Sequence, residues 1–427
     1  MTYLIIGNGV ASVGAIEGIR RTDPKGRIVV VSQEPTPTYG RPLISYYLAG
    51  KIGAEGLPLR PDSFYTDKKV ELRLAETVTS LDLKAKKAVT DKGEIKYDKL
   101  LVATGGKPFV PPIPGKDGSG VYSFTTKAHA DQLIELAGKV KKVVVIGGGL
   151  IGLKAGESLF DRGVDVSIVE LASRVLSAAF DDAAGGIVAE RLAQVGLKVF
   201  CNVSAKEITR GKKGEIKGVT LTDGRVLPAE AVVIAIGVTP AMDVAKAAGI
   251  ATERGILVDK HLRTSDKHVF AAGDVAQAPD LLSGEQRVVP IWPNAYDQGF
   301  YAGRNMAGDK ADYLGGLPMN SISFYGLPTQ SVGLVNPPAE DKKISVEAVL
   351  DQENRTYRKL VFKGGKLIGY VLVGNIENSG LFTSFVKFGF PVSDEVKKRL
   401  LAGEPGVLLW PEEFLKETWN PRKRSAA

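Results

Sequence analysis

The strongest constraint on the fold of this chain is a pair of glycine-rich turns that begin at residues 7 and 147. The first reads GNGVAS over residues 7–12, and the second reads GGGLIG over residues 147–152. Each turn follows an apolar run typical of a buried strand and precedes a helical pattern. In that order, the glycines let the backbone approach a pyrophosphate, and the helix N-terminus supplies N–H donors to it. We therefore expect two dinucleotides on one chain, an arrangement typical of enzymes that pass electrons between them.

The sequence repeats the layout of strand, turn and helix around both turns. The apolar runs at residues 100–106 and 232–237 both end in glycine, and the alternation of strands and helices predicts doubly wound, parallel α/β sheets. We expect two Rossmann-like domains, the second inserted in the first, and then an antiparallel α+β domain. The predicted domains span residues 1–112 with 239–318, residues 113–238, and residues 319–427. The strands expected in the last domain are 331–335, 345–349, 358–362 and 367–373.

Charge and cysteine content exclude several functions. The chain has 56 Lys and Arg against 48 Asp and Glu, a net charge of +8, and its basic residues fall in short, separate clusters. We therefore expect no nucleic-acid partner, although the surplus favours an acidic protein partner. Cys201 is the only cysteine, so we expect no intramolecular disulfide and no metal cluster in this chain. No apolar run reaches the roughly 18 residues of a membrane span, and no leader pattern is evident, so the expected location is cytoplasmic.

An acidic residue at the end of the second strand of each unit is expected to hold a ribose. Glu170 ends that strand in the second unit, and its carboxylate would repel a 2′-phosphate, which favours NAD(H) over NADP(H). Arg174 weakens that preference. In the first unit Glu34 is the nearest acidic residue, but it lies two positions beyond the expected one at the end of the strand. Either glutamate could instead be an ordinary surface acid.

Five motifs, in order over residues 1 to about 308, resemble the FAD-containing pyridine nucleotide-disulphide oxidoreductase superfamily. Besides the two turns, they are residues 39–45 (YGRPLIS), 103–105 (ATG) and 271–276 (AAGDVA). The chain is most similar to the branch of rubredoxin reductases and nitrite reductase flavoprotein domains. The resemblance implies FAD on the first turn, NAD(H) on the second, and an interface role for the C-terminal domain.

The resemblance also implies roles for single residues. Asp274 would bind the FAD ribitol, Arg41 and Pro42 would lie along FAD, and Trp292 would border the isoalloxazine. The residues expected to bind FAD are Gly7, Gly9, Val10, Ala11, Ser12, Glu34, Arg41, Pro42, Ala103, Thr104, Gly105, Gly273, Asp274, Trp292 and Ala295. The residues expected to bind NAD(H) are Gly147, Gly149, Leu150, Ile151, Gly152, Glu170 and Gly237.

The chain departs from the superfamily in its redox groups. It has no CxxxxC pair, and Tyr46 stands where the single-cysteine members carry their redox cysteine. Cys201 lies in a predicted strand of the NAD(H) domain and is interpreted as a buried structural residue. Lys154 stands where many members carry a glutamate near the flavin. Lys154 and Tyr46 are therefore the candidate catalytic residues at the flavin, although Lys154 could also be a surface lysine.

Without a thiol relay, the resemblance implies hydride transfer between NAD(H) and flavin, and direct electron transfer between flavin and an external partner. The expected partner is an acidic iron–sulfur protein of the rubredoxin or ferredoxin type, or an iron–sulfur subunit of a larger complex. One alternative is an NADH oxidase that reduces oxygen or small acceptors. A second is a non-catalytic flavoprotein that docks or signals.

Overall fold

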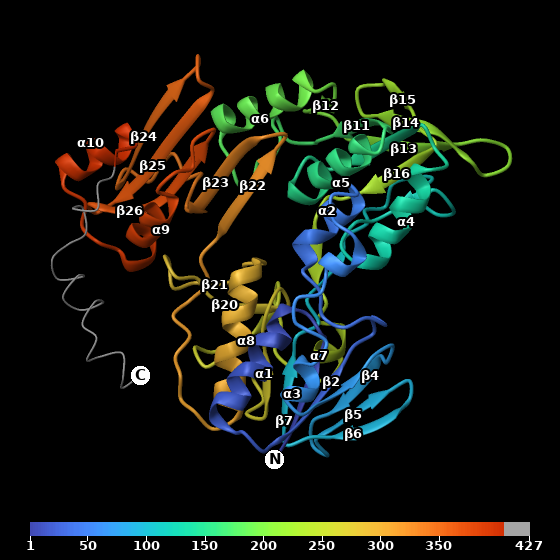
Figure 1. Cartoon of the computed structure of the whole chain (residues 1–427), viewed down its shortest axis with the longest axis vertical. Coiled ribbons are helices and arrows are strands. Elements are labelled where there is room, and N and C mark those ends of the chain that lie inside the picture. The colour runs from blue at the N-terminus through green and yellow to red at the C-terminus, as the bar shows by residue number, and fades with distance from the viewer. Residues whose placement is uncertain (405–427) are drawn as a thin grey trace. The chain divides into compact units, whose positions relative to one another are not determined.

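The structure is a computed structural model that describes residues 1–404 (Figure 1). It divides into two compact units. The first unit comprises Met1–Leu176 and Leu192–Leu317, and the second comprises Ser177–Arg191 and the residues from Pro318 onward. The C-terminal part of the predicted last domain, residues 405–427, lies outside the described residues. Among the described residues, no helix is long and apolar enough to cross a membrane.

The first unit contains a parallel five-stranded sheet in the order β19-β7-β1-β2-β3. Its strands are β1 (Thr2–Ile6), β2 (Arg27–Val31), β3 (Val70–Arg73), β7 (Lys99–Val102) and β19 (Val269–Ala271). Strand β19 follows the whole inserted domain in sequence, yet it pairs with β7. The predicted insertion of one α/β domain in another is therefore confirmed.

The inserted domain has its own parallel sheet in the order β12-β11-β10-β16-β9. Its strands are β9 (Val121–Tyr122), β10 (Lys142–Ile146), β11 (Asp165–Val169), β12 (Lys198–Phe200) and β16 (Ala231–Ile234). The helices beside it are α4 (Lys127–Ala137) and α5 (Leu150–Asp161), and a small antiparallel sheet contains β13 (Ala205–Arg210), β14 (Ile216–Leu221) and β15 (Val226–Pro228). Strands β10 and β16 are almost entirely apolar, as buried parallel strands require.

The chain passes between the two α/β domains twice, and the two crossings pair with each other. β8 (Gly106–Pro108) and β17 (Val238–Pro240) form an antiparallel ribbon. The proline-rich linker predicted over 108–115 thus begins at the last residue of β8. The other short elements of the first domain are β4 (Val78–Asp82), β5 (Lys87–Thr90), β6 (Gly93–Lys96), β18 (Ile256–Leu257), β20 (Ala276–Pro279), β21 (Gln286–Arg287), α2 (Ile44–Leu48), α3 (Phe64–Asp67) and α7 (Asp243–Ala247).

Helices α1 (Val10–Thr22) and α8 (Trp292–Met306) pack side by side in the first domain (Figure 1). Glycines allow the close approach, since a Cβ atom on Gly299 would lie 1.9 Å from the backbone oxygen of Ala11. Ala11 belongs to the first glycine turn. The contact therefore fixes the start of α1 against the middle of α8.

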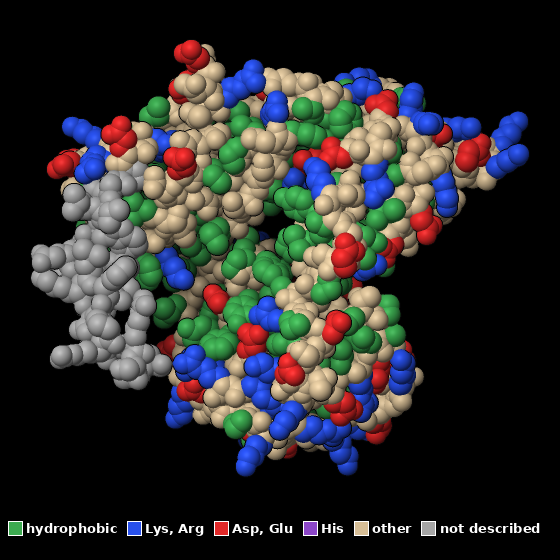
Figure 2. Space-filling model, in the orientation of Figure 1, with side chains coloured by type: hydrophobic (Ala, Val, Ile, Leu, Met, Phe, Trp, Pro, Cys, Tyr) green, Lys and Arg blue, Asp and Glu red, His purple; other side chains and the backbone are tan. Residues whose placement is uncertain are grey.

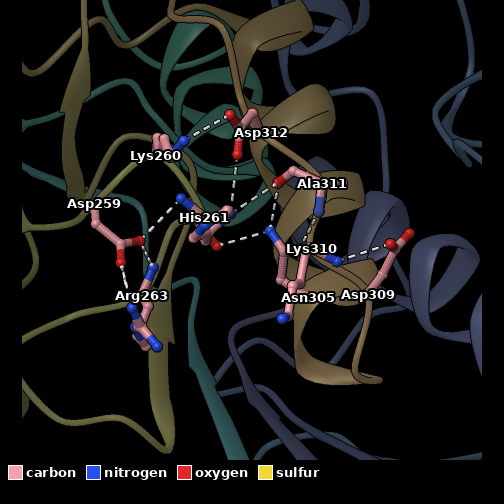
Figure 3. Close-up of polar contacts among 9 residues, drawn as sticks. All are labelled: Asp259, Lys260, His261, Arg263, Asn305, Asp309, Lys310, Ala311 and Asp312. Carbon is pink, nitrogen blue, oxygen red and sulfur yellow. Dashed lines mark hydrogen bonds and ion pairs between the residues drawn. The ribbon is translucent and has the colours of Figure 1, made fainter.

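The chain that leaves α8 is anchored by a network of polar contacts (Figure 3). Asn305 donates from Nδ2 to the backbone oxygens of His261 (3.0 Å) and Ala311 (2.9 Å), and its Oδ1 accepts from the Ala311 N–H (2.8 Å). Asp312 pairs with Lys260 at 2.8 Å and with His261 at 3.3 Å. His261 thus has a structural role.

The second unit contains an antiparallel five-stranded sheet in the order β22-β23-β26-β25-β24. Its elements are β22 (Met319–Phe324), β23 (Leu327–Gly333), β24 (Ile344–Asp351), β25 (Thr356–Lys363), β26 (Lys366–Val373), α9 (Ser379–Phe388) and α10 (Asp394–Ala402). The four predicted strands are present, together with β22, which the sequence analysis missed. The antiparallel α+β fold of this part is confirmed.

Residues 177–191, which include the start of α6 (Asp182–Gln194), belong to this second unit. The predicted boundaries place them in the NAD(H)-binding domain, whereas their contacts are with the C-terminal sheet. Asp181 forms an ion pair of 2.9 Å with Lys359, which is 7% exposed, and accepts a hydrogen bond of 2.7 Å from the Tyr357 hydroxyl. Asn336 also donates to the Phe180 carbonyl at 3.2 Å.

We expect Lys359→Met to destabilise the second unit strongly. Removing one partner of a fully buried pair typically costs about 3–5 kcal/mol, and we expect the lower end of that range because the Asp181 side chain is 19% exposed and keeps its hydrogen bond from Tyr357. Urea denaturation followed by circular dichroism measures the loss. Lys363→Met is the control, because Lys363 pairs with Asp341 from a half-exposed position on the same strand. An equal effect of both variants would contradict the prediction.

The same pair gives an acid-sensitive contribution to stability. Burial raises the pKa of the Asp181 carboxyl, but hydrogen bonds from Lys359 and Tyr357 outweigh it and hold the pKa below the usual 3.8. Since the folded-state pKa is lowered, this stability is present at neutral pH and is lost as the pH falls below 3.8.

Candidate cofactor-binding site

The first glycine turn lies between the end of β1 and the start of α1. Gly7 has a φ of +104°, and a Cβ atom there would lie 2.2 Å from the Ala103 backbone oxygen. Gly9 is the N-cap of α1 and no side chain caps the helix; the space above Gly9 is open to at least 4 Å. Ser12, in place of the third glycine, donates from its hydroxyl to the Gly7 carbonyl at 2.6 Å. The uncapped N-terminus of α1 therefore borders open space at Gly9.

The second turn repeats this geometry between β10 and α5. A Cβ atom on Gly147 would lie 2.5 Å from the Ala235 backbone oxygen, and one on Gly152 would lie 1.9 Å from the Gly147 oxygen. Gly149 is the uncapped N-cap of α5, again with nothing within 4 Å of a Cβ position. Gly237, at the adjoining strand end, is equally open. The two turns thus have similar geometry, and each joins a parallel strand to a helix in its own α/β domain.

The two predicted ribose-binding glutamates lie differently. Glu170 follows β11 directly, and its carboxylate accepts hydrogen bonds from the N–H groups of Gly148 (2.6 Å) and Ala172 (2.7 Å). It is therefore held against the second turn. Glu34 instead pairs with Arg41 at 2.7 Å and accepts a hydrogen bond of 2.7 Å from the Tyr39 hydroxyl. The structure thus brings together Glu34 and Arg41, two of the predicted FAD residues.

The turn after β19 brings three further predicted FAD residues together. Gly273 packs between the starts of α1 and α8, since a Cβ atom there would lie 3.2 Å from the Ala11 Cβ and 3.6 Å from the Ala295 Cβ. Gln298 accepts a hydrogen bond of 2.8 Å from the Gly273 N–H. Asp274 follows. Burial raises the pKa of its carboxyl, while the Arg41 charge opposes the shift, and no described residue makes a hydrogen bond to it.

The start of α8 borders a cavity. Trp292 is the first residue of the helix and is 37% exposed, Pro293 follows it, and no side chain caps this N-terminus. The cavity has a volume of about 250 Å³, and its lining comprises Val10, Leu59, Arg60, Trp292, Pro293, Tyr296 and Asp297. It therefore lies where α1 and α8 both begin. Predicted Thr104 lies at the nearby end of β7 and donates to the Ala241 carbonyl at 2.7 Å.

These observations fit two dinucleotides. Two uncapped helix N-termini over open glycines suit pyrophosphates, and the partly buried Asp274 carboxylate, to which no described residue donates a hydrogen bond, suits a hydroxyl-rich ribitol. The Asn8 amide nitrogen, in the first turn, is also buried without a partner. The residues present therefore fit FAD on the first turn and NAD(H) on the second.

Lys154 and Tyr46, the two candidate catalytic residues, lie close to each other. The Lys154 Nζ atom is 5.9 Å from the centre of the Tyr46 ring. It also forms an ion pair of 2.6 Å with Glu157, one helical turn further along α5, and the two side chains are 15% and 6% exposed. Lys154 is thus neither a surface lysine nor a lone cation. Glu157 was missed, although its i, i+3 spacing could have revealed it.

Cys201 lies near Glu170, beside the second turn. It follows β12, which ends at Phe200, whereas the predicted strand continued through Cys201 to Asn202; Asn202 instead turns the chain with a φ of +59°. It is half-buried rather than fully buried, and burial and the nearby Glu170 charge raise the pKa of its thiol. Within residues 1–404, no three His, Cys, Asp or Glu side chains are grouped as metal ligands.

Comparisons with known proteins place this architecture in a family. Residues 1–299 match the pyridine nucleotide-disulphide oxidoreductase family, and residues 318–389 match the C-terminal domain of rubredoxin NAD+ reductase. The chain belongs to the pyridine nucleotide-disulphide oxidoreductases, a family of NAD(P)H-dependent flavin oxidoreductases. The predicted family is therefore confirmed.

Three proteins illustrate the relationship. The epsilon subunit of NADH-dependent phenylglyoxylate dehydrogenase from Aromatoleum evansii is 31% identical over 98% of both chains. Nitrite reductase [NAD(P)H] from Bacillus subtilis is 30% identical over 93% of this chain, which spans only about half of that relative (48%). The crystal structure of a ferredoxin reductase from Rhodopseudomonas palustris superimposes with a TM-score of 0.84 and 30% identity, over 92% of this chain and 96% of the other.

Proposed function

We propose that this chain passes electrons between NAD(H) and an iron–sulfur protein, or an iron–sulfur subunit of a larger complex, through FAD and without a redox-active cysteine. Two observations together carry the proposal. Both glycine turns border open space, and a tyrosine, Tyr46, stands at the position of the family's redox cysteine. Cys201 lies instead beside Glu170, at the second turn.

The chain's own residues would bind and position the cofactors. The N–H groups at the starts of α1 and α5 would hold the two pyrophosphates, and Asp274 would accept hydrogen bonds from the FAD ribitol. Glu170 would bind the NAD(H) ribose and disfavour a 2′-phosphate, so NADH is preferred to NADPH. FAD, when bound, supplies the conversion between a two-electron donor and single electrons.

An external iron–sulfur partner is supported by the names of the similar proteins. One is a ferredoxin reductase, one is a dehydrogenase subunit, and the C-terminal domain matches that of rubredoxin NAD+ reductase. The net charge of +8 would attract an acidic partner. Basic side chains are interspersed with acidic ones over the face in Figure 2, so the attraction would be diffuse.

We expect Cys201→Ser to retain the full rate of NADH-dependent rubredoxin reduction. The half-buried thiol lies beside the proposed ribose carboxylate and has no place in the electron path. Steady-state reduction of rubredoxin measures the rate, and alkylation of the wild-type thiol tests the same point independently. A loss of electron transfer in the serine variant, with NADH affinity unchanged, would refute the thiol-free route.

We expect Lys154→Met to lower the reduction potential of the bound flavin. The substitution leaves the Glu157 carboxylate buried without its nearest cation. Loss of one positive charge near the flavin would lower its potential by an amount on the order of tens of millivolts. Dye-equilibrated redox titration measures the shift. Lys154→Met/Glu157→Gln is the matched control, because it removes both charges and should restore most of the potential. An unchanged potential and NADH reduction rate in Lys154→Met would exclude a role at the flavin.

A further inference from the structure

The outer edge of the C-terminal sheet is a regular, apolar strand. β24 forms this edge, and among residues 1–404 it pairs only with β25, without a register shift (Figure 1). Edge strands are usually protected by lysine, proline or a bulge, and residues 344–351 contain none of these. Val346, Val349 and Leu350 are instead 45%, 49% and 46% exposed.

The exposed side chains are arranged by face. Because side chains alternate along a strand, Val346, Ala348 and Leu350 lie on one face of the sheet, and all three are exposed. Glu347 lies on the other face, where it forms an ion pair with Lys397 of α10. β24 thus presents unpaired backbone groups and an apolar stripe at the same edge.

We propose that β24 pairs in antiparallel fashion with β24 of a second copy of this chain, about a twofold axis at Ala348. A twofold axis normal to the sheet leaves each side chain on the same face of the sheet in both copies. Residues directly opposite each other must therefore point to the same face, which is possible only when the axis passes beside a residue and not between two residues. Centring on Glu347 would place two Glu347 carboxylates opposite each other, and centring on Val349 would place Glu347 opposite Asp351. Centring on Ala348 avoids both acid–acid contacts and places Val346 opposite Leu350 twice.

The ends of the strand also favour a second copy as the partner. Lys342 and Lys343 precede β24, whereas Asp351 ends it and Glu353 follows. Antiparallel pairing brings the basic end of one copy beside the acidic end of the other, which stabilises cross-strand contacts. The two sheets would form one continuous ten-stranded sheet. This inference does not depend on the proposed function.

A charge swap tests the register. In the FAD-loaded full-length chain, Val346→Lys/Leu350→Lys would place lysine opposite lysine twice, and we expect the dimer dissociation constant to rise at least about tenfold. Val346→Glu/Leu350→Lys alters the same positions but places opposite charges together, so it should stay dimeric. Sedimentation equilibrium measures both. A monomeric wild type, or two variants of equal affinity, would overturn the proposal.

Cross-linking tests the axis independently. In a Cys201→Ser background, Ala348→Cys should form a disulfide-linked dimer under mild oxidation, because its two copies would be directly opposite. Val346→Cys should not, since its copies would lie about 13 Å apart along the strands. Non-reducing electrophoresis distinguishes them. Two outcomes would overturn the proposal. If the wild type is a dimer but Ala348→Cys does not cross-link, the interface lies on another surface. If a larger complex forms only with a different subunit, β24 binds that subunit and not a second copy.

Discussion

Gly152→Ala is expected to lower the rate of flavin reduction by NADH about a hundredfold in a protein that still carries FAD. The added Cβ atom would lie 1.9 Å from the backbone oxygen of Gly147, so the second turn must open. Misplacing the start of α5 by about 1 Å displaces the bound nucleotide, and such displacements cost about a hundredfold in rate. Stopped-flow absorbance of the flavin band measures the rate, and the visible spectrum of the purified protein confirms that FAD is retained.

The equivalent change in the first turn should have the complementary effect. Gly7→Ala would place a Cβ atom 2.2 Å from the Ala103 backbone oxygen in a residue whose φ is +104°, so we expect the protein to purify without FAD. Gly186→Ala is the control for both, because the same atom there would meet nothing within 4 Å. Loss of FAD from the Gly152 variant, or retention of FAD by the Gly7 variant, would contradict the assignment of the turns.

Gly299→Ala is expected to destabilise the first unit by about 3 kcal/mol, at the upper end of typical overpacking costs. A Cβ atom would lie 1.9 Å from the Ala11 backbone oxygen, so α1 and α8 must separate. Since Ala11 belongs to the first turn, FAD should also be released at a lower temperature. Urea denaturation and flavin fluorescence during heating measure the two effects. A variant as stable as Gly186→Ala would show that the helix contact can relax without cost.

Much of this architecture could be predicted because it depends on local patterns. The glycine turns, the β-branched strands beside them and Glu170 at the end of β11 are set by short stretches of sequence. The pairing of Glu34 with Arg41 could not be predicted, because it joins two loops whose separation only the folded chain determines. The resemblance named both residues but not their contact.

Long-range contacts account for the main differences from the predictions. Residues 177–191 lie between two strands of the inserted domain in sequence, yet the partly buried Asp181–Lys359 pair joins them to the second unit. The contact between Asp181 and Lys359 could not be predicted from the sequence, since a lysine in a strand is normally exposed to solvent. Likewise, the sequence analysis treated Lys154 as a single cation. In the structure, Glu157 is buried beside it, so the charge of the ion pair as a whole has to be considered.

The central claim, a thiol-free electron path to an iron–sulfur partner, is tested most directly by double-mixing stopped flow. The enzyme is first reduced with one equivalent of NADH without oxygen, and then mixed with rubredoxin, with ferredoxin or with air-saturated buffer. We expect fast flavin reduction, slow reoxidation by air, and reoxidation by an iron–sulfur protein that is much faster and slows with added salt. Fast reoxidation by air alone would indicate an oxidase, and a reduced complex that reacts with none of the acceptors would indicate a non-catalytic flavoprotein; either would contradict the proposal.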